Sequence, residues 1–165
     1  MDADFATYAA ARWPRLVRSA VLLGCDAHEA EDVAQAALER CLVRWDRLVS
    51  RADDVDAYVH RVLITTFVSS RRRPWRRERS TPRLPDTIAA PPGRDLHVVD
   101  VFARALADLT PEHRAVVVLR YFSGLGERQT AEALGIPTGT VKSRLHRALA
   151  ALAANPHLAD LQETR

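Results

Sequence analysis

Hydrophobic side chains recur three or four residues apart along most of the chain, with polar side chains between them. This spacing is typical of helices that bury one face, and no segment alternates strongly enough to predict a β-strand. We therefore predict an all-α protein. The predicted helices cover residues 4–23, 27–48, a segment from 54–56 to beyond 68, 97–108, 111–122, 127–134 and 138–153.

Residues with known capping preferences mark where several of these helices begin and end. Asp26 followed by Glu29 is typical of a capping box, in which each side chain accepts a hydrogen bond from the other residue's backbone. Thr110 before Pro111 is typical of an N-cap followed by proline in the first turn. Gly24 is expected to end the first helix.

The same spacing predicts which side chains face the interior. In the first half these are Phe5, Tyr8, Leu16, Val17, Ala20, Val21, Val33, Ala37, Cys41, Leu42, Tyr58, Val59, Val62, Leu63, Phe67 and Val68. In the last predicted helix they are Val141, Leu145, Ala148 and Leu152, at i, i+4, i+7 and i+11.

Residues 80–95 interrupt the helical pattern. This stretch contains four prolines and a glycine in sixteen positions, which exclude a continuous helix and supply little apolar surface. We therefore predict two small helical domains, residues 1–79 and 97–165, joined by a flexible linker at 80–96.

Residues 127–147 predict a helix, a turn and a second helix. Gly135 follows the first helix, where a left-handed backbone is common, and Ala131 is small where the two helices cross. Either Thr138 or Thr140 can cap the second helix. The outward side chains of that helix are Lys142, Ser143, His146 and Arg147. A basic face of this kind suits the major groove, so we predict that this half binds DNA.

Positive charge is concentrated in one segment. The chain of 165 residues has a formal net charge of +3, yet residues 71–83 carry seven arginines and one glutamate. Arginines can neutralise phosphates, and aromatic side chains can stack on unpaired bases. Trp75 either forms such a stacking platform or folds back onto the N-terminal core. The segment 58–78 is therefore a second predicted nucleic-acid surface.

The predicted helix 27–48 has a different character, because its acidic face would repel DNA. Its outward row contains Asp32, Gln35 and Glu39 beside Arg40. The row fits either a protein-docking face or an ordinary solvated surface.

Composition narrows the setting in which the protein works. The chain has no run of about eighteen apolar residues and no basic-then-apolar leader, so we expect a cytoplasmic protein without a membrane span. Cys25 and Cys41 lack metal-ligand spacing and are expected to be reduced and packed.

No residue pattern predicts catalysis, a metal or a cofactor. The nearest approach to a metal-dependent nuclease is Asp53, Asp54 and Asp56, which stand where helix capping also needs acids. The other alternative is an ordinary helix-turn-helix regulator, with a sensing or dimerising domain in residues 1–70.

Three stretches together resemble a bacterial sigma-70 family RNA polymerase sigma factor of the extracytoplasmic-function (ECF) type. AEDVAQAALERCLVRW (30–45) is similar to the family's core-polymerase-binding helix, and AYVHRVLITTFVSSRRRPWRRE (57–78) to its −10 region. Residues 106–152, with the motif GTVKSRLHRAL, are similar to its −35 domain. The resemblance covers about residues 5–155 and implies promoter recognition and melting rather than catalysis.

The resemblance also implies roles for individual residues. The docking face for the polymerase β′ subunit would comprise Asp32, Gln35, Glu39 and Arg40. The −10 element would be read by Arg61, Thr65, Thr66, Ser69, Arg71, Arg72, Arg73, Trp75 and Arg76, with the loop at 50–57 capturing a flipped base. Thr65 stands where family members often have asparagine, so the resemblance does not carry over the −10 base preference.

The remaining implied contacts involve the second half and other proteins. The −35 element would be read by Thr140, Lys142, Ser143, Arg144, His146 and Arg147. The implied partners are core RNA polymerase, through its β′ and β subunits, and promoter DNA. An anti-sigma protein would be a further partner, either covering the docking face or lying between the two halves.

Overall fold

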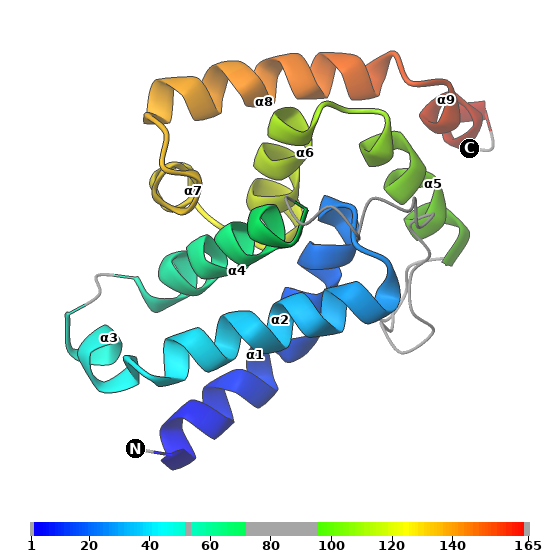
Figure 1. Ribbon diagram of the computed structural model, residues 1–165. Helices are drawn as coiled ribbons and strands as arrows, with labels where there is room; N and C mark the ends of the chain where they lie inside the picture. Colours follow the sequence, from blue (N-terminus) through cyan, green and yellow to red (C-terminus); the bar gives the residue numbers. More distant parts are fainter. Residues whose placement is uncertain (1, 52–53, 72–95, 164–165) are drawn as a thin grey trace.

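The computed structural model describes residues 2–51, 54–71 and 96–163, and all the regular structure in these ranges is helical (Figure 1). The prediction of an all-α fold is confirmed. The first half contains α1 (Asp2–Leu23), α2 (Ala27–Leu42), α3 (Trp45–Arg51) and α4 (Val55–Arg71). The second half contains α5 (Leu96–Ala107), α6 (Pro111–Val117), a π-helical turn η2 (Val118–Phe122), α7 (Glu127–Leu134), α8 (Thr138–Ala153) and α9 (Pro156–Glu163). The predicted linker lies largely outside the described residues.

Most of the predicted helix boundaries are confirmed. Asp26 Oδ1 accepts from the Glu29 N–H at 2.8 Å, and Glu29 Oε2 accepts from the Asp26 N–H at 3.1 Å, which completes the capping box. Thr110 Oγ1 accepts from a backbone N–H in the first turn of α6. Gly24 and Gly135 have φ values of 122° and 65°, which only glycine adopts without strain.

The predicted cap of α8 is wrong. Neither Thr138 nor Thr140 precedes the helix, because the N-cap is Pro137, whose backbone carbonyl accepts from the N–H groups of Thr140 and Val141. Proline fixes its own φ near the value that leads into a helix, so α8 begins directly after it without a side-chain cap.

The predicted continuous helix 27–48 is also wrong, because the chain turns between α2 and α3. Arg44 N donates to Cys41 O at 3.1 Å, a bond that spans three residues rather than the four of an α-helix. Helix α3 then begins at Trp45. The turn brings the Trp45 ring into the core, where its centroid lies 5.1 Å from that of Phe5 and 5.0 Å from that of Tyr8. Burial of this large ring explains the break.

The first half packs α1, α2 and α4 around one core. The interior predictions hold for Leu16, Val17, Val33, Cys41 and Leu63, among others. They fail for Leu42 and Val68, whose side chains are 43% and 40% exposed. Leu38, which is 7% exposed, fills the interior on α2 instead.

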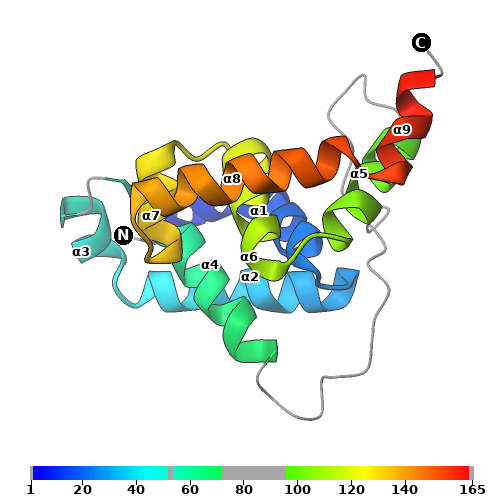
Figure 2. The ribbon, with the colours of Figure 1, turned by 90° about the horizontal axis from the view of Figure 1, so that it is seen from above.

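In the second half, α7 and α8 form the predicted helix-turn-helix. Val116, Ala131 and Val141 form a buried cluster where α6, α7 and α8 meet. The predicted stripe on α8 is confirmed, with Val141, Ala148 and Leu152 buried and Leu145 packed against them. Helix α9 was not predicted; it follows Asn155 and packs beside α5 (Figure 2).

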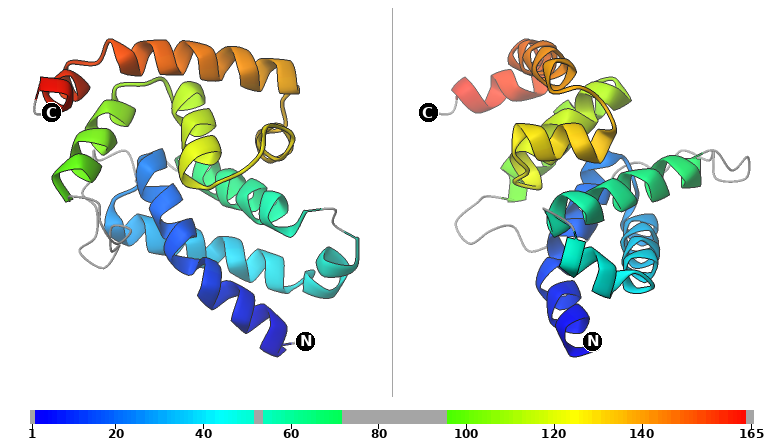
Figure 3. Two further views of the ribbon diagram at one scale, coloured as in Figure 1. Left: turned by 180° about the vertical axis from the view of Figure 1, so that it is seen from behind. Right: turned by 90° about the vertical axis from the view of Figure 1, so that its left-hand side faces the viewer.

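The two halves pack directly against each other, which the sequence did not indicate. Leu22 and Leu23 at the end of α1 share a buried cluster with Leu106 of α5 and Val118 of η2. The views from behind and from one side show α7 lying against α4, and α8 across the top of the second half (Figure 3). We call this contact region between the halves the joint.

Candidate functional site

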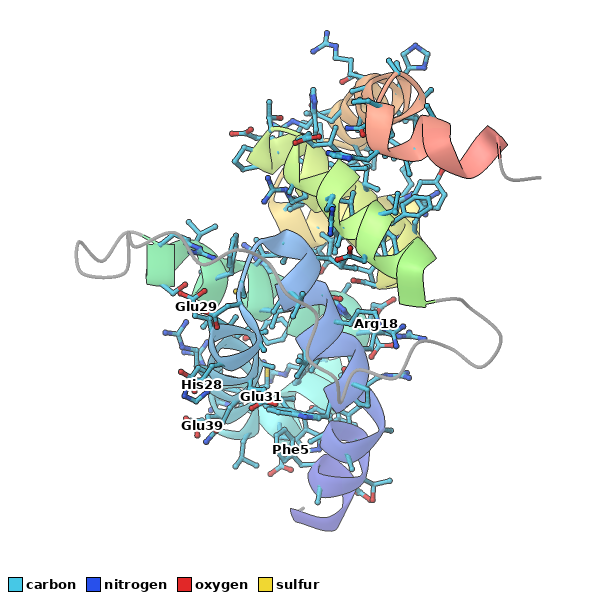
Figure 4. The ribbon with its side chains drawn as sticks, turned by 90° about the vertical axis from the view of Figure 1, so that its right-hand side faces the viewer. Phe5, Arg18, His28, Glu29, Glu31 and Glu39 are labelled. Carbon is cyan, nitrogen blue, oxygen red and sulfur yellow. The ribbon has the colours of Figure 1, made fainter. Side chains whose placement is uncertain are left out.

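The acidic face of α2 is exposed. Asp32, Gln35 and Glu39 lie at i, i+3 and i+7, so they share one side of the helix, and all three are exposed. The Gln35 amide donates to Glu39 Oε1 at 3.0 Å. Figure 4 shows His28 and Glu39 on the outer side of α2, away from α1. The face therefore offers carboxylate and amide groups at fixed spacing to a partner.

Arg40 adjoins this face but reaches toward α4. Its Nη1 donates to Thr66 Oγ1 at 3.0 Å, while the Thr66 hydroxyl itself donates to Val62 O at 2.7 Å. Thr66 is 6% exposed. Its hydroxyl is therefore engaged within the protein, where it holds the Arg40 guanidinium.

An open groove runs between the end of α2 and the exposed side of α4. It has a volume of about 580 Å³ and is lined by Arg40, Val43, Arg44, Tyr58, Arg61, Val62 and Thr65. Three arginines and an aromatic ring are the groups that bind the phosphates and bases of a single strand. The Thr65 hydroxyl donates to Arg61 O at 2.7 Å, so its proton is engaged by the helix and its oxygen faces the groove as an acceptor.

A second pocket, of about 350 Å³, adjoins the groove on the side of α3. It is lined by Arg44, Arg47, Leu48, Arg51, Asp54, Tyr58 and Glu132. All but the last belong to the first half, whereas Glu132 belongs to α7. Sequence reasoning assigned no role to Arg44, Arg47 or Arg51, although their spacing of three and four residues was a usable signal.

Arg71 is bound within the protein. Its guanidinium donates to the Gly24 carbonyl and to Glu29 Oε2, the latter at 3.4 Å, and lies 5.3 Å from the centroid of the Phe67 ring. These contacts tie the end of α4 to the turn after α1. Arg72, Arg73, Trp75 and Arg76 lie outside the described residues.

The outer face of α8 is accessible as predicted. Lys142, Ser143, His146 and Arg147 are exposed, whereas Thr140 and Arg144 are half-buried. Lys142 Nζ lies 3.4 Å from Glu127 Oε1, at the start of α7. Sequence reasoning missed Glu127, whose signal was an acid in the first turn of the preceding helix.

The aspartates at the start of α4 bind other residues of the chain. The Asp56 carboxylate accepts two hydrogen bonds from the Arg12 guanidinium, at 2.9 and 3.0 Å, and one from the Tyr8 hydroxyl, at 2.7 Å. Asp54 Oδ1 accepts from Ala57 N at 2.9 Å, and its Oδ2 accepts from the Gln129 amide. Burial raises the pKa of Asp54, but these hydrogen bonds outweigh it and leave the pKa below its usual value. Both carboxylates are thus engaged in capping and ion pairing.

The two cysteines are unreactive interior groups. Cys25 and Cys41 are both buried and reduced. Burial raises the pKa of the Cys25 thiol to about 12 and that of Cys41 to about 11, so neither forms a thiolate at neutral pH. Among the residues described, no three His, Cys, Asp or Glu side chains gather as metal ligands. None of the described helices is both long and apolar enough to cross a bilayer.

Comparison with protein families defines the class. The model described as Sigma-70 region 2 matches residues 6–77, and the model described as Sigma-70, region 4 matches residues 100–152. The first range contains the α2 face and the groove, and the second contains the helix-turn-helix. Both ranges are parts of sigma-70 transcription initiation factors.

Relatives and solved structures narrow the class further. An RNA polymerase sigma-E factor of Streptomyces avermitilis is 38% identical over 149 residues, covering 90% of this chain and 83% of the relative. The ECF RNA polymerase sigma factor SigL of Mycobacterium tuberculosis is 36% identical over 161 residues, covering 92% and 86%. The sigma factor RpoE of Bartonella quintana, solved with the anti-sigma factor NepR, matches with a TM-score of 0.73 at 25% identity and covers 90% of this chain and 94% of that chain. The chain belongs to the ECF family of RNA polymerase sigma factors.

Proposed function

We propose that the chain docks on core RNA polymerase through α2, captures the melted −10 strand along α4 and holds the −35 duplex with α8. The observation that carries this proposal is the presence of three surfaces of different character in one chain. An exposed acidic face suits a protein partner, a basic groove suits a single strand, and a basic helix suits the major groove. The polymerase would perform the chemistry, in the cytoplasm where it works.

The exposure of Asp32, Gln35 and Glu39 supports the docking face. We propose that these residues contact the β′ subunit. Arg40 would complete the face from the edge of the groove, held there by its bond to Thr66. Enzyme contact and strand contact would then lie on adjacent sides of α2.

The groove is the proposed site of −10 recognition. Arg61, Thr65 and Ser69 are exposed on α4, and Arg61 and Thr65 line the groove with Tyr58. Phosphate neutralisation by the arginines would supply affinity, while stacking of a base on Tyr58 would add about 1–3 kcal/mol. Capture of unpaired bases would offset stacking losses of about 1–2 kcal/mol per step during melting.

The exposed face of α8 is the proposed −35 reader. Base edges would be contacted by Lys142, Ser143, His146 and Arg147. Thr140 and Arg144 would lie nearer the DNA backbone. We take residues 1–79 and 97–165 as the two functional units and 80–96 as the connection between them. The β subunit would contact the second unit. An anti-sigma protein is a further proposed partner, since the RpoE relative was solved in complex with one.

A paired substitution on α2 tests the docking assignment. Asp32→Ala with Gln35→Ala removes two exposed groups, so the fold should be unchanged while affinity for purified core polymerase falls at least tenfold. Glu112→Ala, at an exposed position on α6, is the matched control. Unchanged affinity in a quantitative pull-down with core enzyme would refute the assignment.

The same purified protein distinguishes a sigma factor from a conventional helix-turn-helix regulator. The proposal requires weak binding of promoter duplex by the free chain and start-site-specific transcription once core polymerase is added. In vitro transcription on genomic DNA with mapped start sites provides this readout. Tight binding of a palindromic duplex by the chain alone would instead favour the regulator.

A further inference from the structure

The pocket beside α3 has the chemistry of a single-strand site but contains an acid from the other half of the chain. Arg44, Arg47 and Arg51 supply three positive charges, and Tyr58 supplies an aromatic ring. Such a lining binds a phosphodiester chain with stacked bases. Glu132 projects into the same lining from α7. Its carboxylate brings negative charge to arginines that a DNA phosphate would otherwise neutralise.

One side chain on α7 holds this arrangement in place. Gln129 Oε1 accepts from the Gly126 N–H and closes the start of α7, while Gln129 Nε2 donates to Asp54 Oδ2. An amide is required for both bonds, because a carboxylate accepts at both oxygens and donates at neither. Glutamine at this position therefore serves its own helix and the other half of the molecule at once.

Asp54 has the matching double role. Its Oδ1 caps α4 by accepting from Ala57 N, and its Oδ2 is left to meet Gln129. Apolar packing supports the polar contact, because Ile64 of α4 lies against the cluster formed by Leu119, Leu125 and Ala133. Helix α7 is therefore fixed against α4 by a hydrogen bond at one end of the contact and by apolar packing along it.

We propose that α7 blocks the arginine pocket of the first half in the free protein, with Gln129 as the latch and Glu132 as the group that replaces a DNA phosphate. This inference rests on the proposed function of the first half as a strand-binding module. DNA and α7 compete for the same arginines, so strand binding requires the halves to separate. The free chain would then bind non-specific single strands weakly until binding to the polymerase separates the halves.

Substitution of the latch gives the first test, with a fluorescent mixed-sequence single-stranded 20-mer as the probe. Gln129→Glu keeps the acceptor that caps α7 but places a carboxylate against Asp54. We expect the full chain to bind the probe about fivefold to tenfold more tightly, since the competent population increases. Solution X-ray scattering should show a larger radius of gyration. The added negative charge alone would weaken DNA binding, so a gain in affinity reports opening.

The matched control restores the contact with its polarity reversed. In the double variant Asp54→Asn with Gln129→Glu, the asparagine amide can donate to the new carboxylate while its oxygen still caps α4. Probe affinity and radius of gyration should return to those of the original chain. A double variant that remains as open as Gln129→Glu would overturn the assignment of this hydrogen bond as the latch.

A second pair of variants tests the blocking acid. Glu132→Gln should strengthen probe binding about twofold to fivefold, because one negative charge leaves the arginine pocket. Glu112→Gln makes the same charge change on an exposed part of α6 and should have a smaller effect. Equal effects of the two variants would show that only net charge matters and would overturn the role of Glu132.

The outcomes separate this inference from the proposed function. Whether the original chain binds core polymerase at all, measured by pull-down, tests the sigma-factor assignment whether or not the latch exists. Opening of Gln129→Glu without a gain in probe affinity would overturn the blocking role while the docking assignment stood. Failure of every variant and of the original chain to bind core polymerase would instead overturn the proposed function.

Discussion

At the scale of single residues, Arg71 and Thr66 make contacts within the fold in a segment that is predicted to bind DNA. Arg71 binds the Gly24 carbonyl and Glu29, and Thr66 holds Arg40. Both residues belong to a segment whose composition indicates nucleic-acid contact. A basic run therefore contains residues that position the surface as well as residues that form it, and only their partners distinguish the two kinds.

His60 gives the first half a built-in pH dependence. Its Nδ1 lies 2.8 Å from Asp56 O and must donate to it, whereas Nε2 has no hydrogen-bond partner in the described structure. Burial lowers the pKa of His60, and the nearby guanidinium groups of Arg12 and Arg15 lower it further against the opposing effect of Asp56. The folded state therefore keeps the ring neutral where the unfolded chain would protonate it.

We expect stability to be constant above about pH 7.5 and to fall as the pH drops below about 6.5, the ordinary histidine pKa. The unfolded state then binds one proton more than the folded state, which gives a slope of up to about 1.4 kcal/mol per pH unit. Urea unfolding between pH 5.5 and 8 measures this. His60→Gln should flatten the slope, and an unchanged slope would show that His60 is not its cause.

At the scale of helices, periodicity and capping residues predicted most of the elements but not their long-range partners. The capping box of α2 and the cap of α6 depend on neighbours within three residues, so the sequence contains all that forms them. The break before α3 depends on Trp45 reaching Phe5 and Tyr8, some forty residues earlier in the chain. No local pattern contains that information.

The same distinction applies to the candidate site. Exposure of the α8 face follows from helical periodicity, because burial of Val141, Ala148 and Leu152 fixes the opposite side. The pocket at α3 does not follow, since it needs Glu132 beside residues some eighty positions earlier. Pairings across a long linker depend on tertiary packing, which sequence spacing does not encode.

Helix α9 depends on one asparagine. Asn155 Oδ1 accepts from His157 N at 2.9 Å, and its amide donates to Asp108 Oδ2 at 3.0 Å, which joins the start of α9 to the end of α5. Asn155→Ala removes both bonds and should destabilise α9 locally by about 1–2 kcal/mol. Hydrogen exchange of the α9 amides should accelerate about fivefold to thirtyfold.

Asn155→Ser is the matched comparison, because a serine hydroxyl can still accept at the start of a helix but reaches less far toward Asp108. Its exchange rates should lie between those of the original chain and Asn155→Ala. Exchange that is unaffected by either substitution would mean that apolar packing of Leu158 alone holds α9 in place.

At the scale of the whole molecule, the joint combines a shared apolar core with a few hydrogen bonds between the halves. The groups that make these bonds keep other partners when the halves separate. Arg114 illustrates this: it donates to Leu106 O, Ala107 O and Leu109 O within its own half and to Leu23 O across the joint. When the halves separate, Arg114 would lose only its hydrogen bond to Leu23 O and keep the other three. A joint built in this way is stable in the free chain yet can be opened by a partner that binds the separated form better.

Ser123 offers a mild means of weakening the joint. Its hydroxyl lies 2.7 Å from that of Ser19, and both residues are 1% exposed. The Ser19 hydroxyl also donates to Arg15 O at 2.9 Å, so it stays satisfied when the Ser123 hydroxyl is removed. Ser123→Ala should therefore loosen the joint by about 1 kcal/mol without leaving a polar group unpaired.

If core polymerase binds the separated halves, Ser123→Ala should raise its affinity for the chain by up to about fivefold, since less free energy is spent on opening. Ser50→Ala removes the same atom from an exposed position on α3 and should leave the affinity unchanged. A fluorescence titration of labelled chain with core enzyme measures both. Equal or weaker binding by Ser123→Ala would mean that the polymerase accepts the halves as they pack in the free protein, and that the joint opens only when DNA arrives.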